Sequence, residues 1–87
     1  MKRIEKKTWP EMFEKIKNGE KNFDARIADF KINPGDILIL REWDPKKKKY
    51  TGREIRKQVT YVLKTKKVEF WNKEDLKKHG LQIISFK

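Results

Sequence analysis

The stretch from Thr8 to Ile27, TWPEMFEKIKNGEKNFDARI, decides the fold, because its apolar residues change from a helical period to a strand period. In the first half they recur at positions i, i+3, i+4 and i+7, which form one stripe along a helix. The stripe consists of Trp9, Met12, Phe13 and Ile16. The pattern predicts an amphipathic helix that places Trp9, Met12 and Phe13 in the core.

Residues with known capping roles mark both ends of this helix. Thr8 and Glu11 have the spacing of a capping box, in which two side chains satisfy free backbone amides at the helix start. Pro10 is tolerated in the first turn because an amide there has no partner within the helix. Gly19 can adopt the left-handed conformation that ends a helix. We therefore expect a helix that begins after Thr8 and ends at Gly19.

The second half of the stretch alternates between apolar and polar residues, as a half-buried strand does. One face carries Phe23, Ala25 and Ile27, and the other carries Asn22, Asp24 and Arg26. The alternation predicts a strand in which Asp24 and Arg26 point together into a cleft, opposite the apolar face.

The next residues predict further strands. Asn33-Pro34-Gly35-Asp36 has the composition of a type II turn, in which the glycine takes a positive φ. The continuous apolar run of residues 37–40 then predicts a strand that extends to Trp43. A hairpin loop, bracketed by Asp44-Pro45 and Thr51-Gly52, leads into a long strand. The face of that strand carries Ile55, Val59, Tyr61 and Leu63.

The end of the chain predicts a short helix from near Asn72 to Gly80 and a last strand over residues 81–86. His79 lies at the end of this helix, where a cation suits the helix dipole, so capping explains it better than catalysis. The expected fold class is α+β. One N-terminal helix packs against about five strands in a small curled sheet or barrel, with a short C-terminal helix.

The residues around Lys21 resemble the signature of the ASCH family, G-x-K-x-x-E-x-R, in the PUA-like superfamily. The matching segment is Gly19-Glu20-Lys21-Asn22-Phe23-Asp24-Ala25-Arg26, with Asp24 in place of the glutamate, and it follows the first helix as in that family. The stretches 34–44 and 50–55 also resemble a group of short prokaryotic and phage ASCH-like proteins of unassigned function. The likeness covers roughly residues 8–63.

This resemblance implies a β-barrel whose cleft lies beside the first helix, and it implies RNA binding, with which the superfamily is mostly associated. Some very small members are amidohydrolases that act on N4-acylated cytidines with a lysine, a threonine and a glutamate. Lys21 falls on the lysine position. Asp24 occupies the threonine position and cannot supply a hydroxyl nucleophile. Glu69 lies in the region of the third catalytic residue.

The first candidate site consists of Lys21, Asp24 and Arg26. Two cations beside a carboxylate suit a bound phosphate or a polarised carbonyl group. In an enzyme, Lys21 would act as nucleophile or base and Asp24 as its partner. The alternative is an ordinary same-face pair of Asp24 and Arg26, with Lys21 as a surface residue.

A second candidate pair is Arg41 and Trp43, which lie two residues apart on one strand face. An arginine beside an aromatic ring can stack on a base and hold it. Equally, Trp43 can be a core or cleft-wall residue with Arg41 at the rim.

The positive charge is concentrated in residues 44–67, where ten Lys or Arg stand against two Asp or Glu and give +8 of the net +11. Such a segment attracts phosphate backbones, although a solvated surface of lysines is an equally ordinary explanation. Its candidate nucleic-acid contacts are Lys46, Lys47, Lys48, Lys49, Tyr50, Arg53, Arg56, Lys57, Lys64, Lys66 and Lys67.

Composition excludes several other classes of protein. The chain has no cysteine and a single histidine, so we expect no disulfide, no metal site and no cofactor. No apolar run approaches a membrane span, and the N-terminus lacks the apolar core of a signal peptide. The 87 residues are expected to form a single cytoplasmic domain, with a monomer favoured.

Two functions follow from these residues. The first is a nucleic-acid-binding module, with RNA as the favoured ligand, in which the cleft takes a nucleotide and residues 44–67 form a basic arm. The second is an amidohydrolase of N4-acylated cytidine-type nucleosides. An adaptor that binds protein is a third possibility without a specific sequence sign.

Overall fold

Five strands and one short helix make up the part of the chain that the computed structural model describes, residues 1–65 and 80–87. The predicted C-terminal helix and the candidate residues Lys66, Lys67, Glu69 and His79 lie outside these residues. The elements in chain order are β1 (Arg3–Thr8), α1 (Pro10–Lys17), β2 (Phe23–Ile27), β3 (Ile37–Asp44), β4 (Lys49–Lys64) and β5 (Leu81–Phe86).

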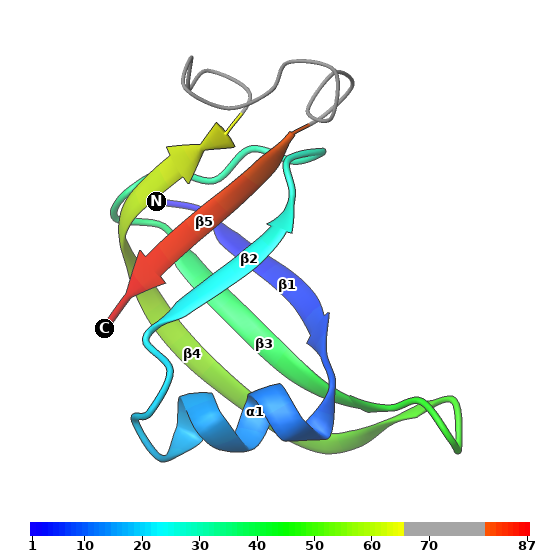
Figure 1. The fold of residues 1–87 in the computed structure, drawn as a ribbon. Helices are drawn as coiled ribbons and strands as arrows, with labels where there is room; N and C mark the ends of the chain where they lie inside the picture. The colour runs from blue at the N-terminus through cyan, green and yellow to red at the C-terminus, as the bar shows by residue number, and fades with distance from the viewer. Residues whose placement is uncertain (66–79) are drawn as a thin grey trace.

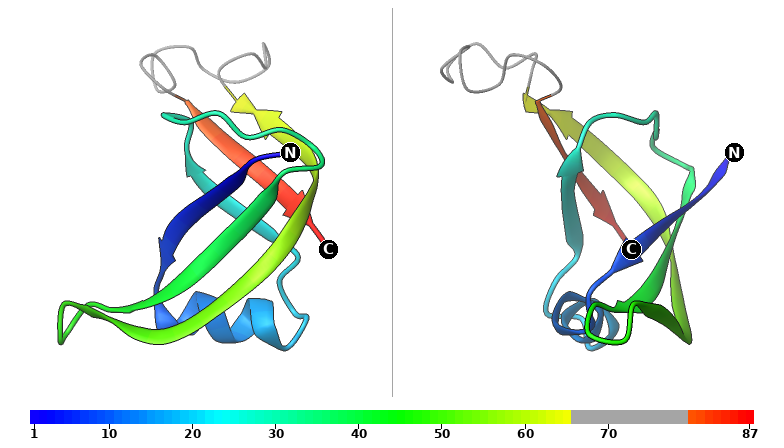
Figure 2. Two further views of the ribbon diagram at one scale, coloured as in Figure 1. Left: turned by 180° about the vertical axis from the view of Figure 1, so that it is seen from behind. Right: turned by 90° about the vertical axis from the view of Figure 1, so that its right-hand side faces the viewer.

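The five strands form one mixed sheet in the order β1-β3-β4-β5-β2 (Figure 1). The neighbours β1 and β3 run parallel, and the other three pairs are antiparallel. The sheet coils so strongly that β2 and β5 lie across the core from β1 and β3 (Figure 2). The predicted α+β class is confirmed. The expected β-barrel is wrong, because β1 and β2 form no ladder with each other and the coiled sheet stays open.

The long strand β4 connects the two halves of this coiled sheet. Its first part, residues 49–58, pairs with β3, and its last part, residues 59–64, pairs with β5. The register shifts between Val59 and Tyr61, where the strand passes from one pairing to the other. A bulge of this kind bends a strand and increases its twist, which lets β4 wrap around the core.

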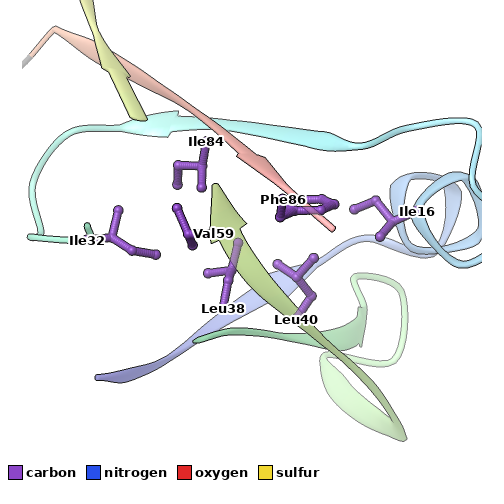
Figure 3. Packing of buried hydrophobic residues seen from close by; sticks show 7 residues of the cluster. All are labelled: Ile16, Ile32, Leu38, Leu40, Val59, Ile84 and Phe86. Atoms are coloured by element: carbon purple, nitrogen blue, oxygen red, sulfur yellow. The ribbon is translucent and has the colours of Figure 1, made fainter. Parts of the chain in front are cut away.

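The core lies inside the coil, where apolar side chains from both halves meet (Figure 3). It consists of Ile16, Ile32, Leu38, Leu40, Val59, Ile84 and Phe86. The helix α1 covers one end of this core with Phe13 and Ile16, which are both buried.

Trp9 and Met12 are exposed, which corrects their assignment to the core. The helix has only eight residues, about two turns, so a single narrow face can reach the sheet. Phe13 and Ile16 occupy that face. Trp9 precedes the helix as its N-cap, and 61% of its surface is accessible, while Met12 is 45% accessible.

The start of the helix also differs from the expected capping box. The N-cap is Trp9, which makes no capping side-chain hydrogen bond, and Thr8 is the last residue of β1. The Thr8 hydroxyl instead accepts a hydrogen bond from Arg26 Nη2 at 3.2 Å. The predicted C-terminal end is confirmed, since Gly19 has a φ of +87° directly after the C-cap Asn18.

The turn before β3 is confirmed as well. The Asp36 amide donates to the Asn33 carbonyl at 3.0 Å, and Gly35 has a φ of +95°. The Asp36 carboxylate accepts hydrogen bonds of 2.9 Å from the amides of Lys2 and Asn33, and these two bonds lower its pKa. This buried carboxylate therefore ties the start of the chain to the turn. The hairpin between β3 and β4 is shorter than expected, because Thr51 and Gly52 lie within β4.

Candidate functional site

The polar face of β2 points into the molecule and its apolar face points outward, the reverse of an ordinary half-buried strand. Asp24 is only 5% accessible, whereas Phe23 and Ile27 are exposed. Pairing with β5 fixes this orientation, since Asp24 lies opposite the buried Ile84. The prediction that Asp24 and Arg26 share an inward face is correct, and the implied burial of the opposite face is wrong.

The structure brings Lys21, Asp24 and Arg26 together at the gap between β1 and β2. Lys21 Nζ lies 3.6 Å from Asp24 Oδ1, and Arg26 Nε donates a hydrogen bond to Asp24 Oδ2. The backbone amide of Lys21 donates to the Lys15 carbonyl at 3.0 Å, which fixes the turn between α1 and β2. The buried carboxylate is therefore held between two cations from its own strand and the preceding turn.

Arg26 also bridges the gap between the two edge strands. Its Nη2 donates to the Lys7 carbonyl on β1 at 2.7 Å and to the Thr8 hydroxyl at 3.2 Å. Because β1 and β2 are not hydrogen-bonded to each other as strands, this side chain supplies contacts that a closed barrel would make through its backbone.

A cavity of about 580 Å³ opens at this gap, between the end of β1, the start of α1 and β2. Its lining residues are Lys7, Thr8, Trp9, Met12, Lys21, Phe23, Asp24, Ala25 and Arg26. A second cavity of about 320 Å³ lies beside Arg26 as well, and Lys6 and Phe30 are among its lining residues. Ala25 and Arg26 line both cavities.

The larger cavity combines a charged floor with apolar walls. Lys21, Asp24 and Arg26 form the floor, where donors can bind an anionic or carbonyl oxygen. Trp9, Met12 and Phe23 add walls that suit a planar ring. Sequence reasoning missed these wall residues. For Trp9, the sequence did contain one signal that it lies outside the helix: it directly precedes Pro10, the first helical residue.

Arg41 and Trp43 belong to a second cluster, at the base of the β3–β4 hairpin, and do not line the larger cavity. The Arg41 guanidinium lies 3.9 Å from the centroid of the Tyr50 ring, and Lys7 Nζ lies 3.8 Å from that of Trp43. The two rings meet edge to face, with centroids 5.0 Å apart. Lys7 connects this cluster with the larger cavity, because its ammonium group lies over the Trp43 ring and its carbonyl accepts the hydrogen bond from Arg26.

The hairpin beyond this cluster presents its lysines to solvent. Lys46, Lys47, Lys48 and Lys49 are all exposed. The turn is held by Asp44 Oδ1, which accepts hydrogen bonds from the amides of Lys46 at 2.9 Å and Lys47 at 3.2 Å. The four ammonium groups therefore project from an ordered turn.

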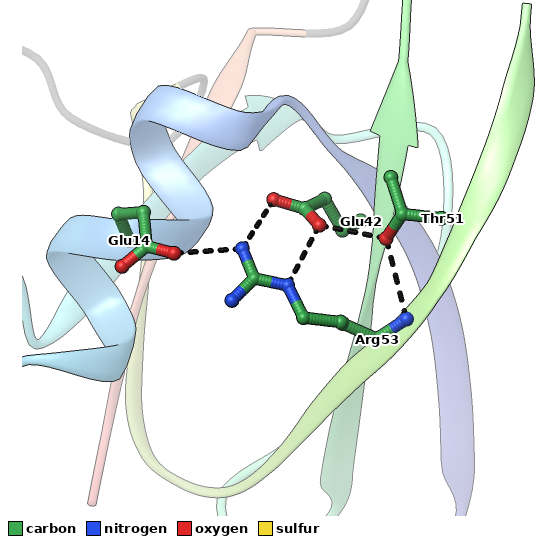
Figure 4. A network of polar contacts seen from close by, with 4 residues as sticks. All are labelled: Glu14, Glu42, Thr51 and Arg53. Carbon is green, nitrogen blue, oxygen red and sulfur yellow. Dashed lines mark hydrogen bonds and ion pairs between the residues drawn. The ribbon is translucent and has the colours of Figure 1, made fainter.

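The remaining described cations of the basic segment have different surroundings. Arg56 Nε lies 3.3 Å from Glu54 Oε2, and Lys57 and Lys64 are half-buried. Arg53 is held by two carboxylates from different elements. Its Nε and Nη2 donate to Glu42 at 2.9 and 2.8 Å, and Nη2 also contacts Glu14 of α1 at 2.7 Å (Figure 4).

This Glu42 network fastens the helix to the hairpin. Glu42 is 4% accessible, and the hydrogen bonds from Arg53 lower its pKa, against the opposing effect of burial. The Thr51 hydroxyl adds a bond of 2.6 Å that acts in the same direction. Glu42 and Glu14 together raise the pKa of the Arg53 guanidinium. The network thus fixes where the exposed hairpin leaves the body of the protein.

Two structural features that would suggest other functions are absent from residues 1–65 and 80–87. No helix there has the length and apolar character that crossing a membrane requires. In the same residues, no three His, Cys, Asp or Glu side chains gather as metal ligands do.

The fold and the cavity define a small α+β domain with an open, coiled sheet and a charged cleft between its edge strands. The chain belongs to the family described as "Domain of unknown function (DUF3850)", which matches residues 5–75. Its fold is similar to that of the crystal structure titled "hypothetical protein PH0355", with a TM-score of 0.66 and 21% identity. That similarity covers 100% of this chain and 98% of the other. No curated protein matches the chain.

Proposed function

We propose that this protein is a nucleic-acid-binding module of the PUA-like, ASCH type, with RNA as its favoured ligand. The observation that carries the proposal is the cavity of about 580 Å³ in which Lys21 and Arg26 flank the buried Asp24. The resemblance of residues 19–26 to the ASCH signature, which these same three residues carry, supports it.

The cavity suits one unpaired nucleotide. Trp9 and Phe23 offer rings on which a base stacks, and Asp24 is an acceptor for an exocyclic amino group. Lys21 Nζ is a donor for a carbonyl or phosphate oxygen. These contacts would hold one base outside a stacked strand.

The basic hairpin would hold the backbone of the same strand. Four exposed lysines at an ordered turn can replace counterions on neighbouring phosphates. The Arg41, Trp43 and Tyr50 cluster lies at the base of this hairpin and continues the cationic surface toward Lys7. Contacts of this kind position a strand and carry little sequence information.

A salt titration with two charge-matched variants tests the proposal. The hairpin variant replaces Lys46, Lys47, Lys48 and Lys49 by Gln, and the control replaces Lys15, Lys17, Lys31 and Lys87, which are also exposed. Both variants lower the net charge from +11 to +7. Binding of a fluorescent single-stranded RNA is measured at several salt concentrations. Each lost phosphate contact reduces the slope of log association constant against log salt concentration by ~0.7, so we expect the hairpin variant to reduce it by up to about 3.

The control variant is expected to change that slope much less. If both variants lost affinity equally, the binding would reflect net charge alone, and the proposed hairpin contact would be wrong. Absence of RNA binding by the native protein at low salt would refute the function itself.

A second candidate function is an amidohydrolase of N4-acylated cytidine-type nucleosides. It is favoured by the approach of Lys21 to Asp24 at 3.6 Å within a cavity open to solvent. In that reaction water adds to the acyl carbon, the bond to N4 breaks, and cytidine and a carboxylate are released. Release of cytidine from N4-acetylcytidine, lost in Lys21→Ala and retained in Lys15→Ala, would establish it. No turnover by the native protein would refute it.

A further inference from the structure

The outer side of β2, β5 and β4 carries apolar side chains that no other described element covers. The strand pairings set Phe23 opposite Ser85 and Ser85 opposite Tyr61. Since Asp24 and Ile84 point inward and are buried, their neighbours Phe23 and Ser85 point outward, as does Tyr61. We call this surface the outer face. Its large apolar residues are Phe23, Ile27, Tyr61, Leu63, Leu81 and Ile83.

The two aromatic rings of the outer face stand in one row with a small residue between them. Phe23 is 47% accessible and Tyr61 is 60% accessible. Strands spaced ~4.8 Å apart put these rings roughly 10 Å from each other. Aromatic pairs make contact at centroid distances of ~4.5–7 Å, so neither ring packs on the other.

Ser85 leaves the space between the rings open. Its hydroxyl lies 2.7 Å from the Thr60 hydroxyl and is therefore bound close to the sheet. Each ring thus keeps a free face on which a planar group can stack.

The charge around the outer face favours an anionic ligand. None of the outward positions of β2, β5 and the described end of β4 carries a charge, so the face itself does not repel a polyanion. Lys21 Nζ lies 5.1 Å from the centroid of the Phe23 ring, at the margin of the face. With a net charge of +11, a second copy of the chain would be repelled, whereas a polyanion would be attracted.

The outer face is also smaller than a stable protein interface of ordinary extent. Three strands and five residues along each span roughly 14 by 17 Å, about 240 Å². Stable protein interfaces bury ~800 Å² on each partner. A surface of this area suits a stack of a few flat groups.

We propose that the outer face stacks unpaired bases of a single-stranded nucleic acid, with Tyr61 and Phe23 as the rings that contact them. Exposed aromatic side chains on a sheet are an effective base-stacking surface because every base has a π face. The proposal rests on the proposed nucleic-acid function and adds a contact surface outside the cavity. Phe23 lies at the boundary between the outer face and the cavity, since it also lines the cavity.

The test uses Tyr61, because it lies on the outer face and does not line the cavity. The full chain, Tyr61→Ala, Tyr61→Leu and Tyr61→Phe are titrated into a fluorescein-labelled ten-nucleotide oligouridine at several salt concentrations. We expect Tyr61→Ala and Tyr61→Leu to raise Kd about tenfold at every salt concentration, and Tyr61→Phe to bind like the native chain. The slope against log salt stays unchanged because stacking releases no counterions.

A duplex of the same oligouridine with oligoadenosine supplies the control, since its bases are already stacked and paired. Tyr61→Ala is expected to change duplex affinity less than twofold. The inference is overturned if Tyr61→Ala binds the single strand within twofold of the native chain, while RNA binding as such persists. Failure of the native chain to bind either RNA overturns the proposed function together with the inference.

Two further measurements exclude other occupants of the outer face. A melting temperature lowered strongly in both Tyr61→Ala and Tyr61→Leu would show that another part of the protein covers the ring. Sedimentation that revealed a dimer in the native chain and a monomer in Tyr61→Ala would assign the face to a second copy. Either result would overturn base stacking.

Discussion

The guanidinium of Arg26 on β2 donates a hydrogen bond of 2.7 Å to the backbone carbonyl of Lys7 on β1, and so joins the two edge strands of the described sheet. The same group holds the buried carboxylate of Asp24. One side chain thus closes the open side of the coiled sheet and neutralises the charge beneath it.

Replacing Arg26 by Ala is therefore expected to destabilise the protein by about 1–3 kcal/mol, because Asp24 then remains buried with fewer partners. Urea denaturation gives the change in unfolding free energy. The double variant Asp24→Asn with Arg26→Ala should recover part of the loss, since it removes the buried charge as well. A single variant as stable as the native chain would contradict the role given to Arg26.

The Glu42 network predicts a specific acid sensitivity. Because hydrogen bonds from Arg53 lower its pKa in the folded protein, the Glu42 carboxylate stabilises the fold above its unfolded pKa. That contribution is lost as pH falls below about 4.5, the ordinary value, through the lowered folded pKa. Glu42→Gln should be less stable than the native chain at pH 7 and should lose less further stability on acidification.

Urea midpoints measured from pH 7 to pH 2.5 test this expectation. Asp36, whose pKa is lowered by the amides of Lys2 and Asn33, titrates in the same direction in both proteins and supplies the common background. Parallel curves for the native chain and Glu42→Gln would contradict the assignment.

Gly35 allows a clean test of backbone conformation. Its φ is +95°, and a Cβ there would meet no atom within 4 Å, so a substitution costs conformational energy without a clash. Gly35→Ala is expected to lower stability by about 1–2 kcal/mol. Gly35→Asn should cost less, because asparagine tolerates this region of φ better. Equal thermal midpoints for Ala and Asn would show that the turn changes its conformation.

Tyr50 is expected to hold the base of the hairpin through its ring. The ring contacts the Arg41 guanidinium at 3.9 Å and the edge or face of Trp43. Tyr50→Leu should cost about 1 kcal/mol and speed amide exchange in residues 41–51, whereas Tyr50→Phe keeps both contacts. Identical exchange in the Leu and Phe variants would show that the ring contributes nothing beyond its apolar bulk.

The sequence was sufficient to predict those elements whose signals are local. The apolar stripe and Gly19 predicted α1, and the Asn33–Asp36 turn precedes β3 as expected. The strands β3, β4 and β5 lie where their apolar patterns predicted strands. The grouping of Lys21, Asp24 and Arg26 was also predictable, because a turn and one strand face supply all three.

Features that depend on distant partners were not predictable. β1 has only one apolar residue, Ile4, among charges, and it exists as a strand because it pairs in parallel with β3. Alternation in β2 revealed two faces without showing which is buried. The inner one carries Asp24, because Arg26 and Lys21 compensate its charge there. The capping role expected for Thr8 also depended on a distant partner, because its hydroxyl accepts a hydrogen bond from Arg26 instead.

The sixteen residues of β4 have a consequence for the length of any strand that binds. Tyr50 lies near one end of β4 and Tyr61 near the other, and eleven residues at ~3.3 Å each span at most about 36 Å. A stacked nucleic-acid strand advances ~3.4 Å per nucleotide, so a stacked oligomer of at most about eleven nucleotides reaches from one tyrosine to the other. The length of β4 would then limit the length of strand that binds: affinity should rise with oligomer length up to that size and level off beyond it.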